Sequence, residues 1–125
     1  MSEQTDAGTG ERLAAGIFEV QDSVVGGRHT LILHGELDLQ PALELEAMLR
    51  HIPTEGITGV VIDLSKLTFI GSTGLRAVLL AKDLCEERGH EFFVVPGPRN
   101  VQRLFELTGL DEGLPLLEGS AAPGA

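Results

Sequence analysis

The sequence predicts an α/β fold built on a small mixed β-sheet, in which an N-terminal hairpin precedes parallel strands. Three observations lead to this class. Two strand-like stretches flank Gly26-Gly27, which predicts the hairpin. Strand patterns then alternate with helical patterns, which favours parallel pairing. The chain has 125 residues, of which 42% are apolar, so one domain can bury a core without disulfides or metal.

The first half of the chain contains the hairpin and one helix. Residues 17–25 alternate and are β-branched, and 29–34 form the second strand. Pro41 suits the first turn of the following helix, where its missing N–H leaves no bond unmade. Pro53 ends that helix. One apolar face repeats at helical spacing through Leu45, Met48, Leu49 and Ile52.

The middle of the chain predicts a buried strand followed by a helix. The continuous apolar run 59–64 is typical of a strand covered on both faces. After a short connector, a helix begins at Ser72 and ends at Gly89. Its core stripe consists of Ala77, Leu80, Ala81, Leu84 and Cys85. A second apolar set is either buried as part of a broad face or exposed as a protein-binding patch, and it consists of Leu75, Val78 and Leu79.

The last part of the chain predicts a strand over 91–95 and a helix over 99–108 that stops at Gly109. The inward residues of this helix are Val101, Leu104 and Phe105. Residues 114–117 are compatible with a short edge strand. The order of elements is therefore β β α β α β α, with one further short strand at the end.

The ends of the chain are polar and lack a packing pattern. We therefore expect one domain over 14–117, with flexible tails over 1–13 and 118–125. No apolar run approaches the ~18 residues that a membrane-spanning helix requires. The polar, acidic start also lacks the features of a secretory signal.

Charge and cysteine content limit the partners. Nine basic and nineteen acidic residues give a net charge of −10, which repels nucleic acid and anionic membranes. We therefore expect neither as a partner. The single cysteine, Cys85, excludes an internal disulfide and a cysteine-based zinc site, and it fits a cytoplasmic protein.

Two adjacent hydroxyls, Ser72 and Thr73, open the helix that follows the buried strand. A hydroxyl at a helix start caps backbone N–H groups, and that position also tolerates negative charge. No base lies beside Ser72 in the sequence. The residue is therefore better suited to receive a phosphate than to attack a substrate, and Thr73 is the alternative acceptor.

Three segments carry a family resemblance. Asp63-Leu64-Ser65 and Phe69-Ile70-Gly71-Ser72-Thr73-Gly74-Leu75 resemble the signature of the STAS domain, in particular of bacterial anti-sigma factor antagonists. Gly35-Glu36-Leu37-Asp38 is similar to a second landmark of that family. Pro98-Arg99-Asn100-Val101 resembles the third, together with Leu104, Leu107, Thr108, Gly109 and Leu110. The three lie in the expected order, and the likeness covers roughly residues 16 to 117.

The resemblance implies a small sheet with helices largely on one side, and a regulator that is not an enzyme. In the family the unphosphorylated protein binds an anti-sigma factor with an ATP-binding serine-kinase fold and releases a sigma factor. Phosphorylation of the serine at the position of Ser72 ends that binding, and a serine phosphatase restores it. Nucleotide belongs to the partner, so no cofactor is expected here. The residues implied in partner binding are Asp38, Gly71, Ser72, Thr73, Gly74, Leu75 and Arg76.

The chain departs from the family pattern at Gly71, where an aspartate usually precedes the serine. A missing carboxylate makes added phosphate easier to tolerate, but it also removes a contact for the kinase. An alternative function therefore stays open, a STAS-type binding or scaffold module without a phosphorylation switch. Arg76, one turn on, either pairs with the phosphate or is a solvated surface charge.

The sequence gives weaker support for a metal site, a serine hydrolase or a nucleotide-binding loop. Asp38 and Asp63 follow strands whose ends are expected to meet, but aspartate there more often serves turns and caps than a metal, so no metal site is predicted. The sequence around Ser72 lacks the first glycine of G-x-S-x-G, and no phosphate-binding G-x-x-x-x-G-K-[ST] occurs. We expect surface or edge positions for the four histidines, His29, His34, His51 and His90.

Overall fold

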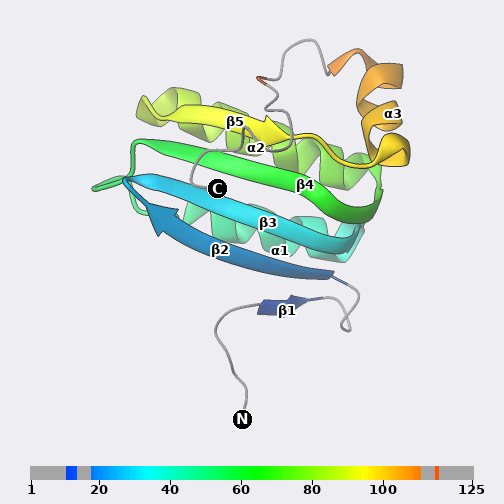
Figure 1. Ribbon diagram of the computed structural model, residues 1–125, viewed down its shortest axis with the longest axis horizontal. Coiled ribbons are helices and arrows are strands. Elements are labelled where there is room, and N and C mark those ends of the chain that lie inside the picture. Colours follow the sequence, from blue (N-terminus) through cyan, green and yellow to red (C-terminus); the bar gives the residue numbers. More distant parts are fainter. Residues whose placement is uncertain (1–10, 14–17, 111–114, 116–125) are drawn as a thin grey trace.

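A computed structural model describes residues 11–13, 18–110 and 115, and for 11–13 it describes the backbone. It has five strands and three helices in these ranges (Figure 1). The elements are β1 (Glu11–Leu13), β2 (Phe18–Val25), β3 (Arg28–Leu37), α1 (Leu39–Arg50), β4 (Gly59–Ile70), α2 (Ser72–Arg88), β5 (Glu91–Val95) and α3 (Arg99–Thr108).

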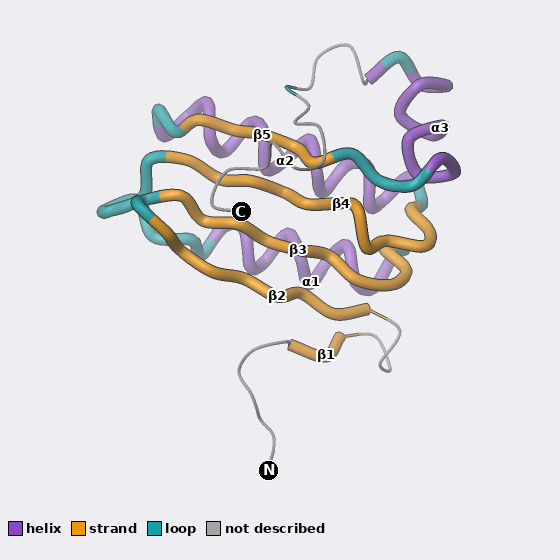
Figure 2. Tube along the Cα trace, in the orientation of Figure 1, coloured by secondary structure: helices purple, strands orange, loops and turns teal. Residues whose placement is uncertain are grey.

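The five strands form one mixed sheet in the order β1-β2-β3-β4-β5. The first two pairings are antiparallel, and β3–β4 and β4–β5 are parallel. Gly26 and Gly27 both have positive φ, 58° and 83°, as a tight hairpin turn requires. Helices α1 and α2 lie side by side behind one face of the sheet, and α3 lies at the end where β4 and β5 stop (Figure 2). The predicted fold class is therefore confirmed.

The core lies between the sheet and the two long helices. From α1 it includes Leu45 and Leu49, as predicted from their spacing, and Met48 packs against it. The helix α2 buries a broader face than the predicted stripe: Leu75 and Val78 are 5% and 0% exposed, whereas Leu84 is only partly buried. The second apolar set of this helix therefore belongs mostly to the core.

The strand β4 is twice as long as the apolar run that predicted it. It continues from Gly59 to Ile70, so the expected connector before Ser72 is part of the sheet. The reason is tertiary, because β3 also extends to Leu37 and supplies a parallel partner. Two register shifts in that pairing, between Ile32 and His34 and between Gly35 and Glu36, let the strand continue although Ser65 and Lys66 are exposed.

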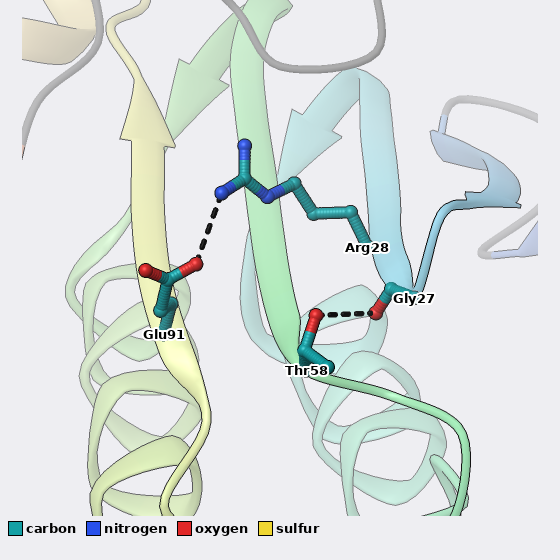
Figure 3. Close-up of polar contacts among 4 residues, drawn as sticks. All are labelled: Gly27, Arg28, Thr58 and Glu91. Atoms are coloured by element: carbon teal, nitrogen blue, oxygen red, sulfur yellow. Dashed lines mark hydrogen bonds and ion pairs between the residues drawn. The ribbon is translucent and has the colours of Figure 1, made fainter.

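Polar contacts across β4 stabilise the end of the sheet where the parallel strands begin. The Arg28 guanidinium reaches over this strand and donates to the Glu91 carboxylate at 2.9 Å (Figure 3). It also lies 5.1 Å from the centre of the Phe93 ring. Gly59 stands between them in the register, and a Cβ there would lie 3.3 Å from that of Glu91. Three strands are thereby tied together at the end remote from Ser72.

The ends of the chain differ in part from expectation. Glu11–Leu13 pair with β2 as β1, so paired structure begins inside the tail predicted over 1–13. Without β1, the outer backbone groups of β2 would have no strand partner there. Of the predicted edge strand over 114–117, only Pro115 is described, and its carbonyl accepts the Val94 N–H at 3.0 Å. The other predicted tail residues, 1–10 and 118–125, lie outside the described residues. Among the described helices, none has the length and apolar character to cross a membrane.

Candidate functional site

The candidate site lies at the edge where β3 and β4 end and α1 and α2 begin. The last residues of the two strands, Leu37 and Ile70, are paired in register. The Gly71 N–H then donates to the Leu37 carbonyl at 3.0 Å. Each strand passes directly into its helix through one residue, Asp38 or Gly71. The N-termini of the two helices are consequently held next to each other.

Ser72 is exposed in the first helical position of α2, and Gly71 is the N-cap. The expectation that the Ser72 hydroxyl caps the helix is therefore wrong. The backbone of Gly71 is extended, with φ −97° and ψ −179°, and its carbonyl already accepts the Leu75 N–H at 3.0 Å. Because the N-cap has no side chain, the helix starts without a side-chain cap, and the serine hydroxyl faces solvent.

Thr73 follows inside the first turn, as expected, but its hydroxyl is inaccessible. Its Oγ1 is buried and has no hydrogen-bond partner among the described residues. Of the two adjacent hydroxyls, Ser72 is thus the one that an external group can reach.

Asp38 brings a carboxylate to the start of α2. Its Oδ1 lies 2.8 Å from where a Cβ on Gly71 would be. A ring carbon of Phe69 lies 3.6 Å from the same point. Any side chain at position 71 would compete with these two groups for space. Glycine is therefore the residue that lets the Asp38 carboxylate approach the first turn of α2.

Gly74 and Leu75 support the site from beneath. A Cβ on Gly74 would lie 2.5 Å from the Leu37 carbonyl oxygen and 2.9 Å from a side-chain carbon of Ile70. Both neighbours belong to the ends of the strands, so the helix can approach them this closely only with glycine. Leu75 is 5% exposed and packs in the core. These two residues position Ser72, and of the two alternatives for Leu75 the structure supports burial in the core over an exposed patch.

Arg76 is exposed and lines a shallow groove of about 270 Å³ between α1 and α2. The other lining residues are Glu46, Arg50, Leu79, Leu80 and Asp83. Arg76 forms no ion pair within the part of the chain that the structure describes. It remains a cation one turn away from the serine.

Asp63 does not join Asp38. It lies within β4, where it pairs with Ile32 and Val95, and its Oδ1 accepts the Ser65 N–H at 2.8 Å. The predicted meeting of the two carboxylates fails because β4 continues for seven residues beyond Asp63 to Ile70. Within the described ranges, no group of three potential ligand side chains could hold a metal ion.

Three of the four histidines lie at the ends of their elements remote from Ser72. His51 and His90 follow the C-terminal ends of α1 and α2, and α2 alone is 17 residues, or ~25 Å, long. His29 is 8% exposed, so its predicted surface position is wrong. Like Leu31, two residues further along the strand, it lies on the buried face of the sheet. Its Nε2 contacts the Asp22 carboxylate at 3.1 Å. These three histidines do not supply a base for the serine.

A family model described as "Mlab, STAS domain" matches residues 20–118. The chain belongs to the STAS domain family. The anti-sigma-B factor antagonists of Staphylococcus aureus (strain NCTC 8325 / PS 47) and Staphylococcus epidermidis are each 28% identical over 86 residues, which is 69% of this chain and 80% of theirs.

Solved structures agree with this assignment. An anti-sigma factor antagonist from Mycobacterium paratuberculosis superposes with a TM-score of 0.70 at 28% identity, over 79% of this chain and 84% of that one. The Bacillus cell fate determinant SpoIIAA in its phosphorylated form has a TM-score of 0.64 at 20% identity, over 80% of this chain and 90% of that one, and shares the fold.

Two features of this STAS domain were missed from the sequence. The first is a set of exposed apolar side chains near the ends of β3 and β4 and on α1: Leu39, Leu43 and Phe69 are 57%, 52% and 43% exposed. The spacing of Leu39 and Leu43, four residues apart and off the core face, was the available signal. The second feature is Asn100, whose amide donates to the Thr68 carbonyl at 2.8 Å and ties α3 to the end of β4. No local pattern predicts that contact.

Proposed function

We propose that this STAS domain is an anti-sigma factor antagonist, a binding regulator rather than an enzyme. The observation that carries the proposal is the exposed Ser72 at the start of α2, without a base beside it. The relatives of similar sequence carry the same role in their names. Unphosphorylated, the domain binds an anti-sigma factor with an ATP-binding serine-kinase fold and so releases a sigma factor. Its place of action is the cytoplasm.

Phosphorylation of Ser72 by that partner is the proposed off switch. Phosphate adds about −1.5 to −2 charges at neutral pH. It would enter an edge that already carries the Asp38 carboxylate and the exposed side chains of Leu39 and Phe69. A partner interface that excludes water from this surface tolerates a serine hydroxyl. A phosphate there must keep water molecules or pair with a cation. Because about 1.4 kcal/mol changes affinity tenfold, no backbone movement is needed. A serine phosphatase reverses the modification.

The proposed binding surface is the edge around Ser72. Asp38, Gly71, Thr73 and Arg76 surround the serine, and Gly74 and Leu75 hold it in place from the interior. The domain itself needs no cofactor for this role, because ATP is bound by the partner.

A second candidate is a binding or scaffold module without a phosphorylation switch. The observation that favours it is Gly71, which leaves the site without a carboxylate of its own at that position. In that case a ligand or a signalling complex would engage the domain, and Ser72 would remain unmodified.

Intact-mass measurement after incubation with serine-kinase anti-sigma factors and Mg-ATP separates the two candidates. We expect wild type and Thr73→Ala to gain one phosphate and Ser72→Ala to gain none. Phosphate on Ser72→Ala but not on Thr73→Ala would move the switch to Thr73. If no partner modifies wild type while a positive-control substrate is modified, the scaffold function is favoured.

A further inference from the structure

The carboxylate at the start of α2 comes from another element of the fold. The first turn of α2 contains no acidic residue, and the N–H groups of its first residues lack partners within the helix. The Asp38 carboxylate lies next to the N-cap of this helix, with Oδ1 at 2.8 Å from the position of a Cβ on Gly71. The sequence neighbour of that glycine is the exposed Ser72. Asp38 therefore lies where it can respond to charge at position 72.

The local structure explains why Asp38 is available for this role. It is the N-cap of α1, and its carbonyl accepts the Ala42 N–H at 2.8 Å. An N-cap side chain usually accepts an N–H from the second or third helical residue. The third residue here is Pro41, which has no N–H, and the Asp38 side chain makes no capping bond to its own helix. The carboxylate is thus left to face the neighbouring helix.

We propose that Asp38 is the positioning residue through which the domain senses negative charge on Ser72. In the unmodified state its carboxylate occupies the start of α2. A phosphate on Ser72 brings further negative charge next to this carboxylate and repels it. Asp38 then turns away from α2, which alters the surface next to Leu39 at the start of α1. The inference rests on the proposed phosphorylation of Ser72 for its biological meaning.

The test needs only the full chain and no kinase. The folding equilibrium constant is measured by urea unfolding for wild type, Ser72→Asp, Asp38→Asn and the double variant. We expect Ser72→Asp to lower this constant about three- to tenfold more in the wild-type background than in the Asp38→Asn background, where the carboxylate charge is absent. The difference should shrink when NaCl is raised, because salt screens exposed charges.

A matched cycle with Ser72→Asn provides the control, because asparagine has the shape of aspartate without its charge. A merely structural role of Asp38 would give the same coupling to both substitutions. Additive effects of Ser72→Asp and Asp38→Asn at low salt would overturn the inference. If Asp38→Asn does not fold, Asp38→Ser replaces it in both cycles. If the cycle shows coupling but no kinase partner phosphorylates the wild type, charge sensing by Asp38 stands and the proposed phosphorylation switch is rejected. Failure of the inference and failure of the proposed function are therefore distinguishable.

Discussion

Position 74 accepts only a hydrogen as its side chain. A Cβ there would lie 2.5 Å from the Leu37 carbonyl oxygen, a backbone atom that moves only with the end of β3. The neighbouring Gly71 has a different constraint, because its closest neighbour is the end of the Asp38 side chain. The two glycines of the signature therefore serve different purposes: one brings the helix against the sheet, and the other admits a carboxylate.

Gly74→Ala is expected to lower the free energy of unfolding by about 2 kcal/mol, because the added methyl group forces backbone to shift. The better helix propensity of alanine offsets part of this cost. Urea unfolding measures the loss. Gly71→Ala is the matched control, and it should cost less because the Asp38 side chain can rotate away. A larger loss for Gly71→Ala than for Gly74→Ala would contradict this assignment.

Thr73→Val should raise the free energy of unfolding by about 1 kcal/mol. The Thr73 Oγ1 is buried without a partner in the described residues, and an unpaired buried hydroxyl costs stability that an isosteric methyl group does not. Chemical denaturation checks the direction. Ser72→Ala, which removes an exposed hydroxyl, should stay within about 0.5 kcal/mol of wild type. A less stable Thr73→Val would indicate that water or a partner group satisfies this hydroxyl.

At the scale of elements, α2 connects the site to the remainder of the core. Its start carries Ser72, one face of its body is buried, and it ends at Gly89 in the left-handed conformation with φ 71°. Near that end the Arg88 guanidinium donates to the Ile52 and Arg50 carbonyls at 3.2 and 3.3 Å. A cation there satisfies carbonyls at the C-terminal end of α1. The two helices are thus joined at both ends, by Arg88 at one and by Asp38 and Gly71 at the other.

The buried thiol of α2 gives a pH-dependent contribution to stability. Burial raises the pKa of Cys85 from 9.0 to about 11, partly opposed by the charge of Arg88. The folded state therefore keeps its proton at pH values where the unfolded chain loses it. The contribution of this thiol to the free energy of unfolding is fully present below about pH 9 and is lost as the pH rises toward 11.

Urea unfolding of wild type and Cys85→Ala between pH 7 and pH 11 tests this sign, since groups common to both proteins cancel in the difference. We expect the stability of wild type relative to Cys85→Ala to be constant up to about pH 9 and to fall above it. A difference that stays flat to pH 11 would mean that the thiol ionises equally in the folded and unfolded states.

At the scale of the whole molecule, the two ends of the sheet differ in the side chains that they carry. The end where the parallel strands begin is cross-linked by the Arg28–Glu91 ion pair (Figure 3). Arg28 also lies over the Phe93 ring. The end where they stop carries Ser72, Asp38 and exposed apolar side chains. Placing function at the carboxyl ends of parallel strands is general in α/β folds, because connecting segments there can vary without disturbing the sheet.

The net charge of −10 should oppose compactness through self-repulsion. We expect the Tm to rise when NaCl is increased from about 20 mM to about 500 mM, as the screening length shortens to a few ångströms. The same salt increase near pH 4.7, the isoelectric point of the sequence, serves as the control and should raise the Tm less, because the net charge there is close to zero. A Tm that falls with NaCl would show that attractive ion pairs such as Arg28–Glu91 outweigh the repulsion.

Local patterns predicted most of the elements and the position of the site. The strand over 91–95 and the helix over 99–108 have the predicted bounds. Ser72 was placed correctly at the start of a helix. The exposed Leu39, Leu43 and Phe69 were not predicted, because exposure depends on which neighbours cover a residue.

The sequence by itself determined the alternation of strands and helices, the turn glycines and the segment that presents Ser72, because these depend on residue spacing and on backbone preferences within a few residues. The tertiary structure decided the length of β4, the burial of Leu75 and His29, and the separation of Asp63 from Asp38. It also decided that the Asp38 carboxylate fills the space at Gly71. These features join residues that lie far apart in the sequence, and only the packing of the two strand ends brings them into contact.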